Sequence, residues 1–263
     1  MFGLFKKKEL PKTFGSLVTD MHCHLLPQVD DGSKSLEESL EVLQTMKAVG
    51  FDEVRITPHF LFPRFVNDED DITTRFGNFC KEVDHYRETM DLPRLVDISG
   101  EYRVDDGFKD YFDRGKMLTL PFNIDGNGSA EKSKGLLLTE FSLHQPRMGC
   151  EEAIFDCQMA GYEVVLAHPE RYPYYDSYSK KLEQMKEQGV YFQVNILSLD
   201  GFYGESSKKK AFDFIENGWV EFLGTDMHNI VYAEALRHAS RNKKIIRLLE
   251  KNDFLNSKLV ESV

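Results

Sequence analysis

The sequence predicts an α/β protein in which parallel strands alternate with helices. Seven short apolar runs of strand-forming residues are separated by stretches with helical periodicity, which is typical of repeated βα units. The length of 263 residues also suits a single α/β barrel, which needs about 250 residues. We therefore expect one barrel domain over residues 16–263, preceded by an N-terminal arm over residues 1–15.

The seven predicted strands are short and are distributed along the whole chain. They cover residues 17–19, 54–57, 95–99, 136–139, 164–167, 191–196 and 220–224. A turn-rich, polar stretch over residues 121–135 predicts a loop inserted before the fourth strand. No repeat of fixed period and no long linker interrupts this order, which favours a single domain.

The predicted helices lie between these strands. In the first, over residues 35–49, Ser35 and Glu38 have the spacing of a capping box. Apolar residues then recur at helical intervals up to Gly50, which ends the helix. The other helices are expected near residues 70–90, 150–160, 179–188, 206–217 and 233–250.

Composition argues against several classes of protein. The 33 Lys and Arg against 44 Asp and Glu give a net charge of −11, whereas nucleic-acid binding needs surplus positive charge. No stretch approaches the roughly 20 apolar residues of a membrane span, and the first residues lack the order of a secretory signal.

Four Cys without a CxxC pair predict reduced thiols and a cytoplasmic protein. Lysines at positions 6–8 leave weak contact of the arm with an anionic membrane surface as an alternative to a frayed arm.

Side chains that can bind metals follow six of the seven strands. They are His22, His24 and Asp31 after the first, His59 after the second, Glu101 after the third, Glu140 after the fourth, His168 after the fifth, and Asp226 and His228 after the seventh. Any one of them would more often be solvated or structural. However, their spacing is roughly one βαβ unit of about 30 residues or more, and the strand ends of a parallel barrel converge on one face. Nine such groups exceed the needs of one tetrahedral zinc and suit two or three divalent ions such as Mn, Fe or Zn.

Other catalytic motifs are absent from the sequence. No Cys has an Arg six positions later, so the loop of the cysteine-nucleophile phosphatases is missing. The sequence also lacks a GxGxxG after a strand, a GxxxxGK[ST] loop and a GxSxG elbow. Tyrosines at positions 172, 174, 175 and 178 predict structural packing, with the rim of the site as the alternative.

With these residues placed, the sequence resembles the polymerase-and-histidinol-phosphatase (PHP) superfamily. Within it, four strings resemble the bacterial CpsB/CapC-type manganese-dependent tyrosine phosphatases. They are DMHCHLLPQVDDG at 20–32, TPH at 57–59, AHPERY at 167–172 and GTDMHN at 224–229. The resemblance runs from about residue 17 to about residue 250. It implies a distorted seven-stranded (β/α)7 barrel of the PHP fold, with the active site at the C-terminal ends of the strands.

The resemblance also implies the roles of individual residues. It makes the nine side chains the ligands of about three divalent ions, with Mn foremost and Fe, Zn or Mg as alternatives. Arg171 matches an arginine that contacts the phosphate, and Asp226 and His228 join it as catalytic candidates. A second arginine expected shortly after the GTDMHN string is missing, since residues 229–236 contain none. The loop at 121–135 also looks longer than usual, and both departures bear on substrate choice.

The chemistry that the resemblance implies is hydrolysis of phosphotyrosine. Clustered divalent ions would lower the pKa of a water so that hydroxide attacks phosphorus in line, while Arg171 stabilises the equatorial charge. The resemblance implies a partner, the phosphotyrosine-bearing tail of a bacterial tyrosine autokinase that controls capsule or exopolysaccharide synthesis.

Three alternatives stay open at this point. A histidinol-phosphatase-like enzyme would share the metals and hydrolyse a small molecule. A PHP nuclease would need a basic groove for its nucleic acid, which the net charge of −11 disfavours. A non-catalytic scaffold on a PHP barrel would have no use for nine ligands. The physiological substrate, the metal, the oligomeric state and the role of the arm are not fixed by the sequence.

Overall fold

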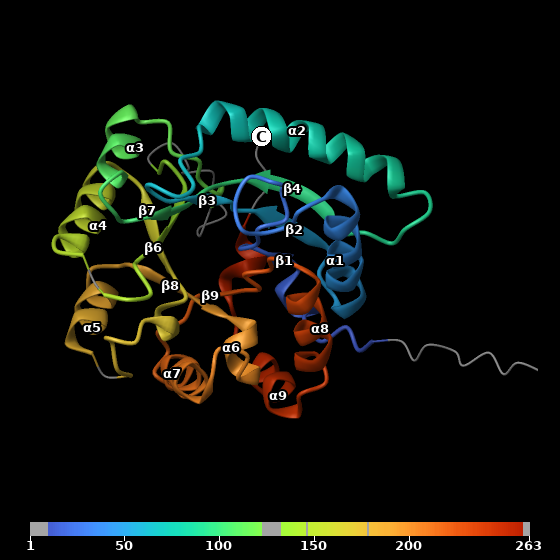
Figure 1. Cartoon of the computed structure of the whole chain (residues 1–263). Helices are drawn as coiled ribbons and strands as arrows, with labels where there is room; N and C mark the ends of the chain where they lie inside the picture. Colours follow the sequence, from blue (N-terminus) through green and yellow to red (C-terminus); the bar gives the residue numbers. More distant parts are fainter. Residues whose placement is uncertain (1–9, 123–132, 146, 178, 260–263) are drawn as a thin grey trace, which may run out of the picture.

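The computed structural model describes residues 10–122, 133–145, 147–177 and 179–259. Their strands are all paired in parallel, as the alternating pattern predicts, but they form two sheets (Figure 1). The first sheet has the order β1-β2-β4, with β1 at Thr19–Asp20, β2 at Glu53–Ile56 and β4 at Arg94–Ile98. The second has the order β3-β5-β6-β7-β8-β9, with β3 at His59–Phe60, β5 at Glu101–Arg103, β6 at Leu136–Glu140, β7 at Glu163–Ala167, β8 at Tyr191–Asn195 and β9 at Phe222–Gly224.

Two of the seven predicted runs extend past an interruption, which is why nine strands are described. Between β2 and β3 lies Pro58, which has no N–H for a strand ladder. Between β4 and β5 lies Gly100, where a Cβ would come within 2.7 Å of the Phe60 ring. The chain therefore leaves the first sheet and enters the second at these two points. The described strands form two ladders and not one closed seven-stranded barrel.

The segment that follows β1 is hydrogen-bonded to the segment that follows β9. The backbone N–H of Asp226 donates to the carbonyl of His22 at 2.8 Å, and that of His24 donates to the carbonyl of Met227 at 2.8 Å. The hydroxyl of Thr225 also donates to the buried carboxylate of Asp20 at 2.6 Å. These bonds join the segments after the first and last strands, so that side chains about 200 residues apart in sequence lie together.

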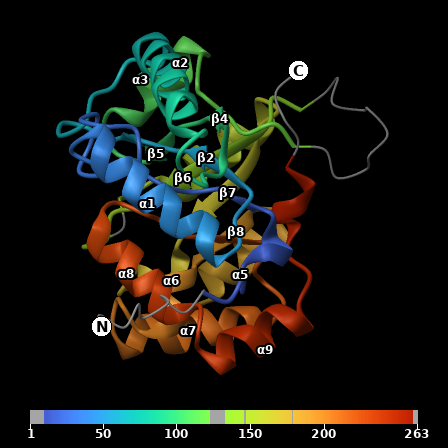
Figure 2. The ribbon, with the colours of Figure 1, turned by 90° about the vertical axis from the view of Figure 1, so that its right-hand side faces the viewer.

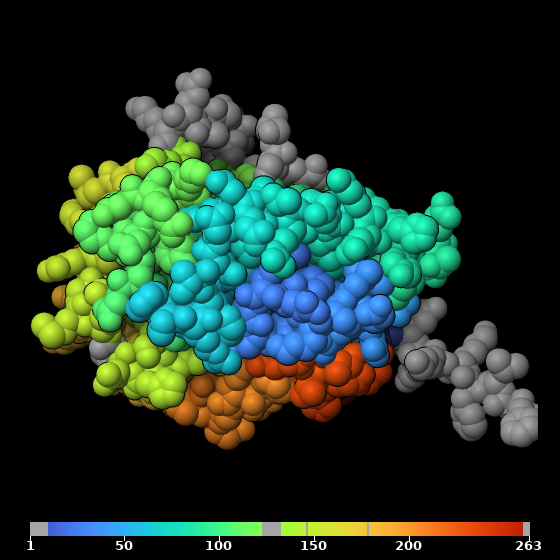
Figure 3. Space-filling view, turned by 45° about the horizontal axis from the view of Figure 1, so that its top comes forward, coloured from blue at the N-terminus to red at the C-terminus, as the bar shows by residue number. Residues whose placement is uncertain are grey.

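Nine α-helices are present in the described part of the chain and lie around the strands (Figure 1). They are α1 at Leu36–Val49, α2 at Glu69–Tyr86, α3 at Phe108–Arg114, α4 at Cys150–Met159, α5 at Lys180–Glu187, α6 at Ile196–Asp200, α7 at Glu205–Glu216, α8 at Ile230–Ala239 and α9 at Lys243–Lys251. Early and late segments of the chain are in contact, because α1 packs on α8. The space-filling view shows the same adjacency, with blue N-terminal atoms beside red C-terminal ones (Figure 3).

The first predicted helix is confirmed together with both of its ends. The N–H of Glu38 donates to the Ser35 hydroxyl, and Gly50 takes a left-handed conformation with φ of 118°. The predicted single helix over 233–250 is wrong, because the chain turns after α8 and Asn242 caps a separate helix, α9. The helices α3 and α6 were not predicted; they have seven and five residues, too few for a clear period.

The end of the predicted arm belongs to the core. Phe14 is fully buried and stacks on Phe51 with ring centroids 5.6 Å apart, and Thr13 donates to the carbonyl of Ser240. Positions 1–9 of the arm, and positions 123–132 of the predicted 121–135 loop, lie outside the described residues. None of the described helices is both long enough and apolar enough to cross a membrane.

Candidate metal centre

The nine side chains singled out in the sequence form one continuous cluster at or beyond the ends of strands. His59 and Glu101 are the first residues of β3 and β5, and Glu140 is the last of β6. Each lies within 4.0 Å of at least one other member, measured between a ring nitrogen and a carboxylate oxygen. The members are His22, His24, Asp31, His59, Glu101, Glu140, His168, Asp226 and His228. The structure thus brings all of them together, whereas their role as ligands remains a prediction.

Glu101 lies at the middle of the cluster. Its Oε1 is 2.9 Å from Nε2 of His168 and 3.3 Å from Nε2 of His22. Its Oε2 is 2.9 Å from Nδ1 of His59 and 3.4 Å from Nε2 of His24. A single fully buried carboxylate therefore faces four imidazoles, which suits a ligand shared between neighbouring cations.

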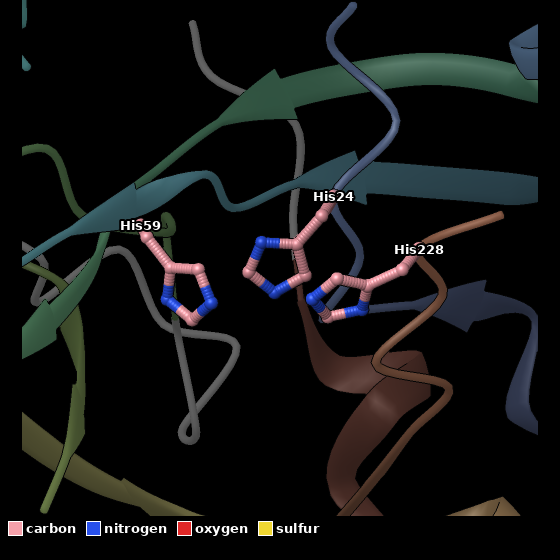
Figure 4. Close-up of side chains that lie close together, drawn as sticks. All are labelled: His24, His59 and His228. Atoms are coloured by element: carbon pink, nitrogen blue, oxygen red, sulfur yellow. The ribbon is translucent and has the colours of Figure 1, made fainter. Parts of the chain in front are cut away.

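Three histidines lie side by side in the cluster. The ring of His24 lies between those of His59 and His228, with centroids 4.4 Å and 4.1 Å away (Figure 4). The outer two rings are 6.0 Å apart. Asp31 lies near both of them, 3.5 Å from Nε2 of His59 and 3.7 Å from Nε2 of His228.

Three groups of ligand atoms are compact enough to hold a cation. They are His24 with His59 and His228, His22 with His24 and Glu101, and His59 with Glu101 and Glu140, each with its atoms within 4.8 Å of one another. The groups share members, so that cations bound in them would be neighbours. Mixed imidazole and carboxylate shells of this kind suit Mn, Fe or Zn.

Buried atoms without hydrogen bonds test whether a cation fits. In the described residues, Oδ1 of Asp31, Nδ1 of His59, Oε2 of Glu101 and Oε1 of Glu140 are buried and lack a hydrogen bond. Each unsatisfied buried polar group costs about 1–3 kcal/mol or more. Other buried atoms without a hydrogen bond, such as Oε1 of Glu69 and Oε2 of Glu170, lie outside the cluster. These four, however, face one another within it and can offer lone pairs once His59 is neutral, so the residues present fit divalent cations.

The local backbone explains how the strands present these groups. His22 and His24 alternate with Cys23 on an extended segment, so that both rings face the cluster while the Cys23 thiol donates to the carbonyl of Arg55 on the other side. His168 and Asp226, which follow β7 and β9, have positive φ angles of 36° and 51°. Such backbone is uncommon for residues other than glycine, and it occurs here at two members of the cluster.

Three polar residues that the sequence analysis missed orient the cluster. Oδ2 of Asp30 lies 2.8 Å from Nδ1 of His24, and Oε1 of Gln193 lies 2.8 Å from Nδ1 of His22. The amide of Asn195 donates to Oδ2 of Asp226 at 2.7 Å. The sequence contained a signal for two of them. Gln193 and Asn195 are two polar residues in a predicted strand that is otherwise apolar, and their spacing of two places both side chains on the same face.

Burial and charge set the protonation of the cluster. Burial raises the pKa of Glu101, but the surrounding histidines, His22 and His59 foremost, hold it well below its ordinary value. Burial and the charge of His24 lower the pKa of His59, yet Glu101 and Glu140 raise it to about 10. For His228, burial and the neighbouring charge of His24 lower the pKa to about 4. The neutral imidazole that metal binding requires is thus already favoured at His228.

A hollow of about 350 Å³ opens onto the cluster, and Arg171 forms part of its wall. The guanidinium of Arg171 donates to Oδ2 of Asp226 at 2.8 Å and lies 4.2 Å from the centroid of the Tyr203 ring. Arg103 and Tyr232 also line this hollow. The lining therefore combines arginines, carboxylates and an aromatic side chain.

The tyrosines and cysteines considered in the sequence do not form part of the described lining of the hollow. Tyr172 is buried and donates to the carbonyl of Ala167, Tyr174 donates to that of Ser142, and Tyr175 is nearly buried, which confirms packing for these three. Position 178 lies outside the described residues. None of the four cysteines lines the hollow.

Comparison with known proteins agrees with this geometry. The model of the family described as capsular polysaccharide synthesis, CpsB/CapC, matches residues 18–251. The tyrosine-protein phosphatase CpsB of Streptococcus agalactiae is 28% identical over 216 residues, 80% of this chain and 83% of that protein. The tyrosine-protein phosphatase YwqE of Bacillus subtilis is 26% identical over 212 residues, 80% of this chain and 77% of that protein.

A solved structure has the same fold. It comes from crystal structures of YwqE from Bacillus subtilis and CpsB from Streptococcus pneumoniae, which are described as unique metal-dependent tyrosine phosphatases. The TM-score is 0.71 at 21% identity, with 93% of this chain and 96% of that one covered.

Proposed function

This chain belongs to the CpsB/CapC family of capsular polysaccharide synthesis, and we propose that it is a metal-dependent protein-tyrosine phosphatase. The observation that carries the proposal is the buried cluster of five histidines and four carboxylates, with Arg171 on its edge and a hollow open to substrate. The family relatives named as tyrosine-protein phosphatases support the substrate class.

The nine cluster residues would hold the metals, and we propose three divalent ions with Mn foremost. When bound, these ions would lower the pKa of a water and polarise phosphoryl oxygens. The compact groups and the unsatisfied lone pairs support this arrangement. Asp30, Gln193 and Asn195 fix the rings of His22 and His24 and the carboxylate of Asp226, so that little reorganisation is needed on binding.

The protein's own residues then position the phosphate. Arg171 is held by Asp226 and by the face of Tyr203, and its remaining N–H groups can donate to an equatorial phosphoryl oxygen. Nδ1 of His228 lies 2.8 Å from the carbonyl of Asp226, which favours a proton on Nδ1 and a free lone pair on Nε2. A phenol with a pKa of about 10 leaves more readily than an alkyl alcohol, so the demand for a general acid is modest.

The setting of the reaction is proposed from the family. We propose that the substrate is the phosphotyrosine-bearing tail of a bacterial tyrosine autokinase, and that the reaction occurs in the cytoplasm, where the four free cysteines stay reduced. We further propose that the two sheets are parts of one distorted (β/α)7 barrel that extends from about residue 16 to the end of the chain. The bonds between the segments after β1 and β9 support this closure.

The test is phosphate release from a phosphotyrosine peptide in Mn²⁺ and in EDTA, with a phosphoserine peptide and histidinol phosphate alongside. We expect turnover of the phosphotyrosine peptide that EDTA abolishes and Mn²⁺ restores. Preference for histidinol phosphate would replace the protein substrate with a small molecule. Absence of any turnover from protein shown to contain metal would overturn the enzymatic proposal and favour a scaffold.

A further inference from the structure

A second hollow lies between α7 and α9, two helices that are side by side in both ribbon views (Figures 1 and 2). Its volume is about 600 Å³. Its floor is apolar and consists of Phe212, Ile215 and Leu248. Three exposed cations lie around it, Lys244, Arg247 and Lys251, and the lining is completed by Glu216 and Asn252. We call this hollow the α7–α9 groove.

The charge of the α7–α9 groove is opposite to that of the protein as a whole. Residues 241–251 contain five Lys or Arg and one Glu, a net charge of +4 in a chain of −11. The rest of the chain therefore carries −15. Positive charge is concentrated where a groove exists, while the protein as a whole would repel polyanions.

The three cations of the groove are unpaired within the described part of the chain. The side chains of Lys244, Arg247 and Lys251 make no ion pair or hydrogen bond with the residues that the structure describes. They follow one another at spacings of three and four along one helix, where like charges repel by a few tenths of a kcal/mol per pair. An anionic occupant would relieve this repulsion, and the apolar floor would add buried area for its side chains.

The groove lies one helix length away from the metal cluster. Tyr203, just before α7, contacts Arg171 at the cluster, whereas Ile215 and Glu216 are at the other end of this helix. Twelve residues of helix span about 18 Å. An extended peptide at about 3.3 Å per residue needs at least six residues to cover that distance.

We propose that the α7–α9 groove is a docking site for an acidic segment of the substrate protein that also carries apolar side chains. The identity of the partner as a substrate rests on the proposed phosphatase function, whereas the existence of the site rests on the groove. The concave shape and the apolar floor favour a peptide over a flat lipid surface. Docking raises the local concentration of the phosphotyrosine without any change at the cluster.

Direct binding is tested with a fluorescein-labelled peptide of alternating Glu and Leu, by fluorescence anisotropy. The test variant is Lys244→Glu/Arg247→Glu. The matched control is Lys81→Glu/Lys180→Glu, which changes the net charge equally at exposed lysines on α2 and α5. We expect the test variant to lose at least about tenfold in affinity and the control to bind as the wild type does. Equal losses in both variants, or none in either, would overturn the docking site.

A pair of phosphotyrosine substrates links docking to turnover. One is a short peptide, and the other is the same peptide joined to the Glu–Leu segment by a flexible Gly–Ser linker. In the wild type and the control, we expect kcat/KM for the tethered substrate to be about tenfold or more above that for the short peptide. In the test variant, we expect the two substrates to have the same kcat/KM. A tethered substrate with no advantage in the wild type would contradict the proposal. Failure of the proposed phosphatase function would look different from failure of the docking site. The short phosphotyrosine peptide would not be hydrolysed, while anisotropy would still report binding of the Glu–Leu peptide.

Vesicles containing phosphatidylglycerol test whether the groove binds a membrane surface and not a peptide. Sedimentation of the wild type with these vesicles, together with no binding of the Glu–Leu peptide, would overturn the proposal in favour of a membrane surface. Peptide binding that the vesicles do not displace would support it.

Discussion

Nδ1 of His24 lies 2.8 Å from Oδ2 of Asp30, and the same carboxylate oxygen accepts the backbone N–H of His59 at 3.0 Å. Asp30 is therefore a carboxylate that holds the His24 ring in place. This contact leaves Nε2 of His24 directed toward Glu101 and Asp226, at 3.4 Å and 3.3 Å. Burial raises the pKa of Asp30, but the charge of His24 and its hydrogen bond lower it more, so the carboxylate is charged when the ring is held.

The first prediction concerns this contact. Asp30→Asn should lower Mn²⁺ affinity by about 10- to 100-fold while leaving the fold intact, because the amide keeps the shape and loses the charge that orients the ring. Isothermal titration of the metal-free protein measures it. Asp253→Asn is the control, since Asp253 is exposed and away from the cluster. Unchanged affinity in Asp30→Asn would show that the His24 ring is fixed by other contacts.

The second prediction concerns the centre of the cluster. Glu101→Gln should reduce the amount of metal bound per chain and lower kcat/KM by at least about 100-fold. The Glu101 carboxylate lies next to four imidazoles, and an amide is a poorer metal ligand than a carboxylate. Metal content by mass spectrometry is compared with Glu187→Gln, at an exposed position of α5. Full metal content in Glu101→Gln would remove Glu101 from the ligand set.

The third prediction concerns the arginine at the edge of the hollow. Arg171→Lys keeps the charge but loses the planar fork, so we expect kcat/KM to fall by about 100-fold with little change in metal content. Inhibition by inorganic phosphate should weaken in parallel. If phosphate inhibits the variant as strongly as the wild type, Arg171 does not contact the phosphoryl group.

The fourth prediction concerns the aromatic wall. Tyr232 lines the hollow, and its ring centroid is 5.2 Å from that of His228. Tyr232→Ala should lower kcat/KM for a phosphotyrosine peptide by about tenfold and leave that for a small alkyl phosphate nearly unchanged, because only an aromatic substrate loses a packing partner. Equal losses for both substrates would indicate damage to the cluster.

The fifth prediction concerns pH and stability. Burial raises the pKa of Asp20 to about 7, although Thr225 donates its backbone N–H and its hydroxyl to the carboxylate. The folded protein thus keeps a proton that the unfolded chain releases near its ordinary value of 3.8, so this group makes the protein less stable as the pH rises from about 4 to about 7. At about 1.4 kcal/mol per pKa unit, the wild type should lose a few kcal/mol of unfolding free energy relative to Asp20→Asn over this range.

Urea unfolding in EDTA at several pH values measures this difference. Comparing the two proteins cancels the opposite contributions of carboxylates with lowered pKa, such as Asp226 and Glu101, which gain stability as the pH rises. Parallel stability curves for the wild type and Asp20→Asn would show that Asp20 is charged throughout.

Long-range contacts account for what sequence reasoning missed in the site. Asp30 and Asp31 are adjacent and chemically equal, and only the position of the His24 ring shows that Asp30 orients while Asp31 faces His59 and His228. Gln193 meets His22 across 171 positions of sequence. No local period encodes such a pair, because it depends on how β8 lies against the segment after β1.

The alternation of strands and helices and the identity of the nine cluster residues were readable from the sequence. Strand and helix periods are local properties. The candidate ligands recur about once per βα unit, so their convergence follows from parallel pairing. The break at Pro58 and the Asn242 cap between α8 and α9 have local causes that the sequence contains, although the predicted strands and helices did not use them. The tertiary structure alone decided the break at Gly100, where the Phe60 ring leaves no room for a Cβ, and the α7–α9 groove. These two features depend on packing between segments that lie apart in the chain, and no local period encodes it.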